Sequence, residues 1–418
     1  MTVRLKRGSG ISRQRRKRAS VLPPLTIVGA LTLSSVALTS AATADSGPEQ
    51  WYLDAMQAEE MWKVSTGEGI TVAVVDGGVR EDTAALKGRV LPGKDVSEQP
   101  GGVNDDPDGH GTSMAELIAG SGKNGGIKGL APGAKIVPFR VQSLAPGEAI
   151  DWSEEEKGGT DKGILAAAES PAQIINVSMG GEIYDPASED AIKYALRKGK
   201  LVFVAAGNDG DGKNARSYPA DSDEAVAVAA VDKSAKAAKF SQHGAYIDLA
   251  APGTDIPGWC RGNFDQYCLG LNGTSASAAI ASASAALIWS EHKDWTANQV
   301  LRVMLETAGR ADKKAQGSSE YIGYGTVRPS RVLLKGEGDP GDPDKFPLAL
   351  KYPLESPSPT PSPAGESSED EKGAAEKVNV AESSESGDDS NLGLIIGTGA
   401  AVAVLAGGAF AFMRMRRK

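Results

Sequence analysis

Residues 70–76 read Ile-Thr-Val-Ala-Val-Val-Asp, a nearly continuous apolar stretch that ends at an aspartate. Further runs rich in Val and Ile follow at intervals along the chain. We predict strands at Ile70–Val75, Lys135–Val141, Ile174–Ser178, Leu201–Ala205 and Ala225–Val231. Because such strands have no polar face, the sheet that they form must be covered on both sides.

Longer stretches with helical spacing separate these runs. The predicted helices are Gly109–Gly120, Asp161–Glu169, Ser188–Lys198, Thr274–Glu291 and Thr296–Thr307. This alternation predicts an α/β fold with a doubly wound, mostly parallel sheet and helices on both faces. In such sheets ligands bind beyond the carboxyl ends of the strands, so polar residues at those ends are the first candidates for a site.

The composition excludes several classes of protein. The chain has 418 residues, of which 24% are charged, so it is not disordered throughout. Its net charge of −9 argues against general nucleic-acid binding, which needs a basic surface. Two cysteines and three histidines leave too little material for a zinc ribbon or a histidine-rich metal site, and no run of alternating acids marks a calcium loop. We expect no metal and no cofactor.

The two ends of the chain differ from its middle. Residues 1–44 combine basic residues, an apolar stretch and a final Ala-Thr-Ala, which predicts a secretory signal peptide, with an uncleaved anchor as the alternative. Arg15-Arg16 leaves open whether export is by the Sec or the twin-arginine route. Residues 391–413 are long and apolar enough to span a membrane, and the basic tail 414–418 places that end in the cytoplasm.

The middle of the chain divides into three parts. Residues 45–69 form a short arm, residues 70–335 a folded domain, and residues 336–390 an acidic Pro/Ser-rich linker that we expect to be disordered. The expected arrangement is a single-pass protein of the cell membrane with its folded domain outside.

Four polar residues stand where predicted strands end or helices begin. Asp76 follows a strand, His110 lies between two glycines, Asn208 closes the strand at 201–205, and Ser275 opens a helix. Singly, each has an ordinary structural alternative: a turn aspartate, a packed histidine, a turn asparagine or a helix cap.

In the order Asp, His, Asn, Ser, these motifs resemble those of the subtilisin-like serine proteases. The likeness covers about residues 64–310 and includes Asn176-Val177-Ser178-Met179-Gly180. It implies that Ser275 is the nucleophile, His110 the general base and Asp76 its partner, with Asn208 in the oxyanion hole. It also implies that Ser178, Met179 and Gly180 pair with an extended substrate, and that Ala205, Ala206 and Gly207 line the pocket before the cleaved bond.

Two departures from the family accompany the likeness. Gly77 follows Asp76, where the family usually has Ser or Thr, and only about 25 residues separate Ala44 from the first strand, too few for a folded pro-domain. We therefore expect the arm around Trp51 to pack permanently on the domain. A short arm, a subtilisin domain, an acidic linker and a membrane helix together resemble the mycosins, membrane-anchored proteases of type VII secretion systems.

Cys260 and Cys268 enclose seven residues in a domain that we expect to be exported, which predicts a disulfide. The leading interpretation is an extracellular serine endopeptidase that cuts extended polypeptides and associates with type VII secretion membrane components. A structural scaffold with dispensable catalysis and a pseudoprotease that binds peptides are the alternatives.

Overall fold

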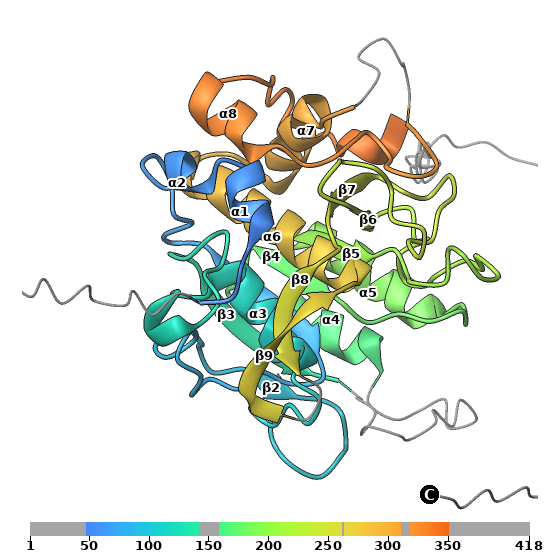
Figure 1. The fold of residues 1–418 in the computed structure, drawn as a ribbon. Coiled ribbons are helices and arrows are strands. Elements are labelled where there is room, and N and C mark those ends of the chain that lie inside the picture. The colour runs from blue at the N-terminus through green and yellow to red at the C-terminus, as the bar shows by residue number, and fades with distance from the viewer. Residues whose placement is uncertain (1–46, 142–158, 261–262, 311–317, 351–418) are drawn as a thin grey trace, which may run out of the picture. The chain divides into compact units, whose positions relative to one another are not determined.

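The computed structural model describes residues 47–141, 159–260, 263–310 and 318–350. A seven-stranded parallel sheet runs through this domain in the order β2-β3-β1-β4-β5-β6-β7 (Figure 1). Its strands are β1 (Thr71–Asp76), β2 (Lys94–Asp95), β3 (Lys135–Arg140), β4 (Ile174–Val177), β5 (Leu201–Ala205), β6 (Val226–Val231) and β7 (Leu249–Pro252). The predicted α/β class with a mostly parallel sheet is confirmed.

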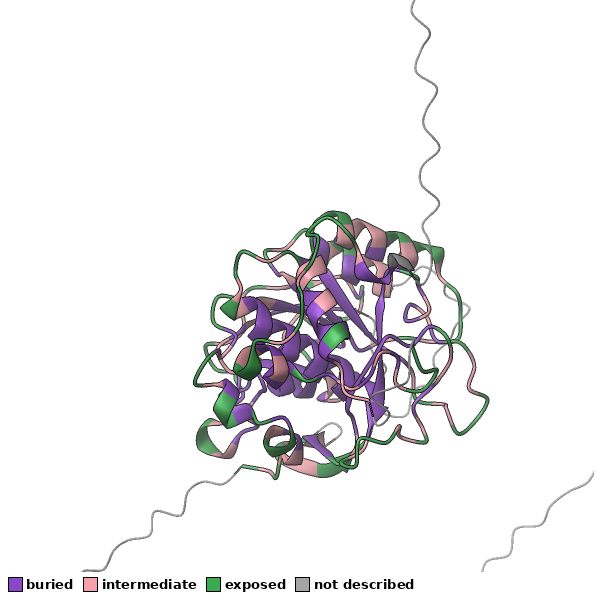
Figure 2. Ribbon diagram, turned by 90° about the horizontal axis from the view of Figure 1, so that it is seen from above, coloured by how far each residue is buried: buried purple, intermediate pink, exposed green. Residues whose placement is uncertain are grey.

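Two hydrophobic cores flank the sheet. Alternate residues of β1 enter different cores: Val72 and Val74 join one, and Ala73 and Val75 the other. The first core is completed mainly by α3 (His110–Ala119), α6 (Thr274–Glu291) and α7 (Ala297–Thr307), and the second by α4 (Thr160–Ala168) and α5 (Pro186–Arg197). Figure 2 shows the buried strands enclosed by helices whose outer turns are exposed.

An antiparallel hairpin of β8 (Ile256–Cys260) and β9 (Asn263–Leu271) lies beside α3 (Figure 1). The disulfide between Cys260 and Cys268 joins its two strands, as the spacing predicted. β9 is mostly exposed, so it lacks the apolar run by which the other strands were found.

The arm consists of α1 (Trp51–Ala55) and α2 (Ala58–Met61) and packs on the first core. Its side chains Tyr52 and Met61 are fully buried. The indole N–H of Trp51 donates to the carbonyl of Thr254 at 2.9 Å, and that of Trp62 to the carbonyl of Leu130 at 2.8 Å. The arm is thus held by both packing and hydrogen bonds.

Helix α8 (Pro329–Lys335) ends at residue 335, where we predicted the domain to end. The described residues continue beyond it to a 3₁₀ turn at Pro347–Leu350. Leu348 is buried, and the Arg302 guanidinium donates to the carbonyl of Lys345 at 2.8 Å. Leu348 joins the first core, so the described residues that follow α8 pack on the domain.

No helix within the described ranges is long and apolar enough to cross a membrane. The predicted signal peptide, the rest of the linker, the membrane segment 391–413 and the tail lie outside those ranges.

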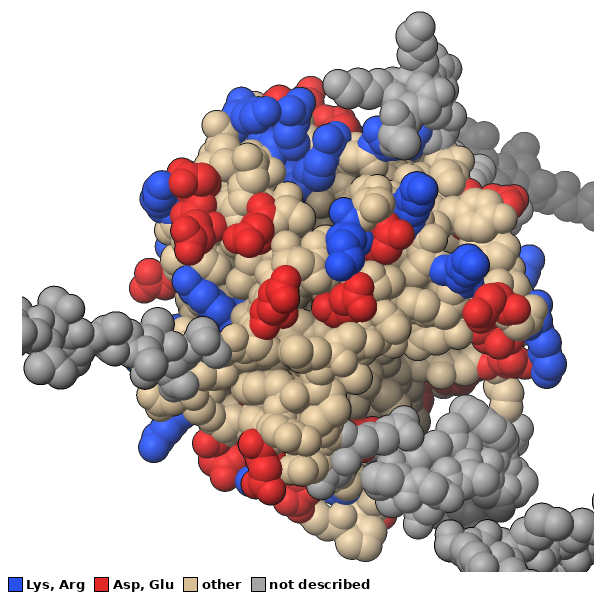
Figure 3. Space-filling view, viewed as in Figure 1, with Lys and Arg blue, Asp and Glu red and all other residues tan. Residues whose placement is uncertain are grey.

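On the face in Figure 3, Lys and Arg gather near the upper edge, where Figure 1 places α8, and elsewhere they alternate with Asp and Glu.

Candidate active site

Asp76 is the last residue of β1 and is 1% exposed. One of its carboxylate oxygens accepts a hydrogen bond from the backbone N–H of Gly77 at 2.8 Å. Gly78 follows with φ +121°, and a Cβ atom there would lie 2.1 Å from the carbonyl oxygen of Asp105. Close packing and the positive φ therefore require glycine at position 78.

His110 is the first residue of α3, and its side chain is 34% exposed. Its Nδ1 lies 2.8 and 3.0 Å from the two carboxylate oxygens of Asp76. This contact assigns the proton to Nδ1 and leaves Nε2 as the basic nitrogen. Gly111 permits the approach, since a Cβ atom there would lie 2.1 Å from the carbonyl oxygen of Gly78.

The charge state of His110 is set by competing influences. Burial lowers the pKa of its imidazole, but the charge and hydrogen bond of Asp76, with the charges of Asp108 and Asp106, raise the pKa from 6.5 to about 9. The site therefore stabilises the imidazolium, the form that His110 takes after it accepts a proton.

Asp106 fixes the start of α3 and was missed in the sequence. Its carboxylate accepts from the backbone N–H groups of Gly109 and Thr112, at 3.1 and 2.7 Å, and from the Thr112 hydroxyl. Burial raises the pKa of Asp106 to about 7, and the charge of Asp76 adds to that effect. An aspartate six residues before a helical threonine is its only sequence signal.

Ser275 is the second residue of α6 and is 8% exposed. Its hydroxyl donates to the carbonyl of Ser178, just beyond β4, at 3.3 Å. The N-terminus of a helix carries a partial positive charge, which favours negative charge developing beside Ser275.

Asn208 lies beyond β5, and Thr274, the residue before Ser275, orients its side-chain amide. Its Oδ1 accepts from the backbone N–H and the hydroxyl of Thr274, at 2.9 and 3.0 Å. The same hydroxyl accepts from the backbone N–H of Gly207 at 3.0 Å. Because the oxygen end of the amide is held in this way, the Nδ2 end is left to donate to another group.

The predicted substrate segments flank the same region. Ser178 to Gly180 follow β4, and Ala205 to Gly207 include the end of β5, the neighbouring strand. Ser217 lies between them: its Oγ would be 3.4 Å from a Cβ atom on Gly180, and its Cβ 3.1 Å from one on Gly207. A Cβ atom on Gly207 would also lie 1.7 Å from Gln242 Oε1, and one on Gly180 would lie 2.9 Å from the carbonyl oxygen of Tyr218, so neither position has room for a side chain.

The hairpin braces the helix that carries His110. The backbone N–H of Trp259 donates to Ser113 Oγ at 2.9 Å, and the Tyr267 hydroxyl donates to Glu116 Oε2 at 3.0 Å. Glu116 is fully buried and also accepts from Thr83 Oγ1 at 2.7 Å. Burial raises the pKa of Glu116 to about 7. No sequence pattern distinguished this glutamate from a surface residue.

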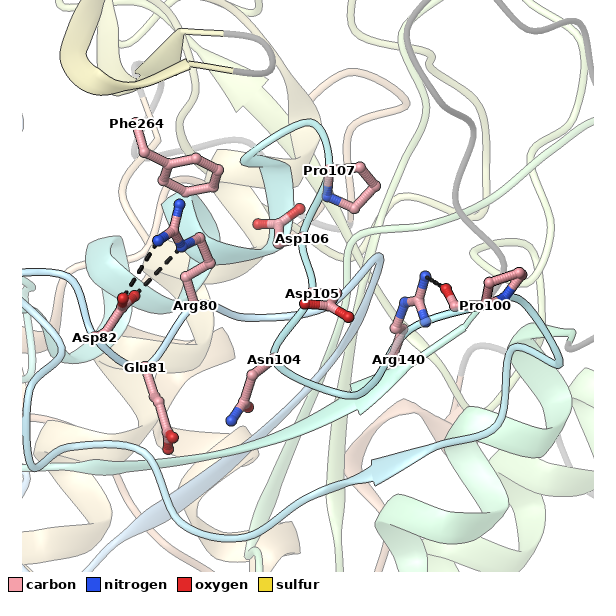
Figure 4. A pocket seen from close by; sticks show the side chains of 10 residues that line it. All are labelled: Arg80, Glu81, Asp82, Pro100, Asn104, Asp105, Asp106, Pro107, Arg140 and Phe264. Atoms are coloured by element: carbon pink, nitrogen blue, oxygen red, sulfur yellow. Dashed lines mark hydrogen bonds and ion pairs between the residues drawn. The ribbon is translucent and has the colours of Figure 1, made fainter.

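A cavity of about 650 Å³ opens beside the loop that leads into α3 (Figure 4). Arg80 on its wall pairs with Asp82 at 3.3 Å and lies over the ring of Phe264, 4.4 Å from the centroid. Arg140 on the opposite wall pairs with Asp95 at 2.8 Å. Acidic and basic side chains thus both line this cavity.

Among the described residues no group of three or more potential metal ligands is found.

Known proteins are similar to this chain in sequence and in fold. Residues 67–325 match the subtilase family. The chain is 36% identical over 247 residues to the major intracellular serine protease of Bacillus subtilis (strain 168), which covers 57% of this chain and 74% of that protein. It is 31% identical over 280 residues to thermitase of Thermoactinomyces vulgaris, covering 66% and 93%.

Solved structures extend the likeness. The MycP3 protease from the type VII (ESX-3) secretion system is 29% identical with a TM-score of 0.59, covering 70% of this chain and 90% of that one. MycP1 from Mycobacterium smegmatis is 27% identical with a TM-score of 0.59, covering 73% and 89%. The family match spans more than half of the chain, so this protein belongs to the subtilase family and is a subtilisin-like serine protease related to the mycosins.

Proposed function

We propose that Asp76, His110 and Ser275 form the catalytic triad of a serine endopeptidase. The observation that carries this proposal is the contact between the buried Asp76 carboxylate and His110 Nδ1, which leaves Nε2 free to act as a base. In this mechanism Ser275 Oγ attacks the peptide carbonyl carbon while His110 Nε2 takes the hydroxyl proton. His110 then gives that proton to the leaving amine, and water releases the acyl group in a second cycle.

The negative oxygen of the tetrahedral intermediate must be stabilised by hydrogen-bond donors. Asn208 Nδ2 and the backbone N–H of Ser275 supply them in this proposal. The orientation of Asn208 supports its role, since Thr274 occupies its oxygen. The substrate backbone pairs with Ser178, Met179 and Gly180 as an added strand, and Ala205 to Gly207 form the wall of the pocket.

A fluorophosphonate probe tests the triad. The wild-type protein should be labelled, whereas Ser275→Ala should not be, with both proteins equally folded by circular dichroism. A folded wild-type protein that resists the probe would refute the proposal and favour the pseudoprotease alternative.

We also propose that the protein is anchored in the cell membrane, with the signal peptide 1–44 removed, residues 391–413 spanning the bilayer and the domain outside. The apolar segment and its basic tail support this arrangement. Deletion of residues 391–418 should move the protein from the membrane fraction to the medium. Retention in the membrane would contradict it.

The likeness to proteases of type VII secretion systems supports a place in such a system, where this protein processes secreted polypeptides. Comparison of a gene deletion with Ser275→Ala separates two roles. If secretion fails only in the deletion, the protein has a structural role apart from cleavage. If both strains behave alike, the scaffold alternative is excluded.

A further inference from the structure

Helix α6 presents an unusually smooth surface to the sheet. Every residue from Thr274 to Trp289 is buried, and from Ser275 to Ala286 the side chains are Ala or Ser except for Ile280. Large side chains interlock and resist sliding of a helix along its axis, whereas small ones resist it weakly. Along this stretch of small residues, hydrogen bonds can therefore decide how far α6 is shifted, and that shift determines where Ser275 lies.

A buried chain of hydrogen bonds ties α6 to β4. Ser282 Oγ donates to Asn176 Oδ1 at 3.2 Å, and Asn176 Nδ2 donates to Ser178 Oγ at 2.8 Å. Ser178 Oγ in turn donates to the backbone carbonyl of Ser275 at 3.4 Å, while Ser275 Oγ donates to the carbonyl of Ser178. Asn176 and Ser282 are fully buried, so neither finds water as a substitute partner.

Helix α6 is attached to β4 and the residues just after it at two points, through Ser282 and through Ser275, and the distance between these points determines which motions they oppose. Ser275 and Ser282 are seven residues apart, which is about two helical turns or 10.5 Å along the axis. Two attachments at that distance on one side of a helix oppose both its translation and its rotation. Asn176 takes part in both attachments. Its Oδ1 accepts from Ser282, and its Nδ2 donates to Ser178, which in turn donates to the carbonyl of Ser275.

We propose that Asn176 is a positioning residue which, together with Ser282, sets the axial register of α6 against β4 and so places Ser275 Oγ for attack. The inference rests on the proposed role of Ser275. Asn176 acts through Ser178 and the helix rather than on the substrate. Ser277 adds a separate tie to the carbonyl of Ala251 in β7, so loss of one tie lowers the rate without abolishing it.

The chain offers a matched control. Ser284 is as fully buried as Ser282 on the same helix, but its hydroxyl donates to the carbonyl of Ile280 within α6 at 2.8 Å. Ser282→Ala and Ser284→Ala therefore remove the same atoms from the same helix. Only the first breaks a bond to the sheet.

We would compare these variants in the full chain, with Asn176→Leu as a stronger perturbation. Since a misplacement of about 1 Å can cost about 10²-fold in rate, we expect kcat to fall about 10-fold in Ser282→Ala and up to about 10²-fold in Asn176→Leu. KM should change less than about twofold, because the substrate strand keeps its backbone, and the fluorophosphonate labelling rate should fall with kcat. Ser284→Ala should keep both rates within about twofold of wild type.

Equal rates in Ser282→Ala and Ser284→Ala would overturn the register proposal, even if Asn176→Leu fails to fold. So would a rise in KM at unchanged kcat. Ser275→Ala is measured alongside: if it still cleaves, the proposed triad fails, whereas if it is inactive and the two serine variants match, only the register proposal fails.

Discussion

Glu116 offers a quantitative test of the contacts that hold the helix of His110. This carboxylate is fully buried, and its two oxygens accept hydrogen bonds from Thr83 and Tyr267. Burial raises the pKa of Glu116 from 4.5 to about 7. Glu116→Gln keeps the shape of the side chain and removes the titrating group.

The sign of the effect follows from linkage. The folded protein binds this proton more tightly than the unfolded chain, so the stability that it contributes is complete below pH 4.5 and is lost as the pH rises to about 7. The difference between the two pKa values corresponds to about 3 kcal/mol. As the pH rises from 4.5 to above 7, the unsubstituted protein should therefore lose about 3 kcal/mol of unfolding free energy relative to Glu116→Gln. Any effect of the substitution that is independent of pH adds a constant to this difference.

Urea unfolding between pH 4.5 and 8.5 measures this difference, with Ser275→Ala in both proteins to prevent self-digestion. Asp106 titrates in the same range, but it is present in both proteins and cancels. Glu59→Gln makes the same chemical change at an exposed position in the arm and is the control for the substitution itself. A difference between Glu116→Gln and its parent that stays constant over this range would refute the reasoning, because it would mean that Glu116 does not pay a burial penalty when charged.

Four further predictions concern the site and the arm. Asp76→Asn should lower kcat by about 10⁴-fold, the loss known for this change in serine proteases, with fluorophosphonate labelling slowed in step. Because catalysis needs neutral His110, activity should be lost as the pH falls through its raised pKa, so the acid limb of kcat/KM should have its midpoint near 9 rather than 6.5. Asn208→Ala should lower kcat by about 10²–10³-fold, as known for the oxyanion-hole asparagine of subtilisin, and leave KM nearly unchanged; a large rise in KM would contradict the role. Trp62→Phe removes the donor to the carbonyl of Leu130 and should cost about 1 kcal/mol in urea unfolding, whereas no loss would mean that this hydrogen bond does not help to hold the arm.

The sequence was most informative where burial is complete. β1 and β3 to β6 are almost entirely buried, so most of their residues are apolar and mark the positions of the strands, with Asp76, Arg140 and Asn176 as buried polar exceptions. β2 has two residues, too few to form a pattern, and β7 (Leu-Ala-Ala-Pro) contains no Val or Ile. The helix at 186–197 starts two residues earlier than predicted, because Asp185 accepts from the N–H groups of the first turn and Pro186 suits its start.

The supporting residues of the site could not be found in the same way. Asp76 and His110 stand beside recognisable glycines, and the structure brings them into contact. Glu116 has no such neighbours, and it draws its importance from Thr83 and Tyr267, which lie 33 and 151 positions away. Polar residues whose role depends on distant partners leave no local signal, so only the folded chain reveals them.

The attachment of the arm has a consequence for the order of folding. Trp51 bonds to Thr254, and Ser65 donates to the carbonyl of Leu287, although the partners are 203 and 222 positions apart in the sequence. Contacts so distant along the chain form late and slow the search for the native topology. The first helices of the domain therefore complete their contacts only after α6 (Thr274–Glu291), more than 200 positions later in the sequence, has been synthesised and has docked.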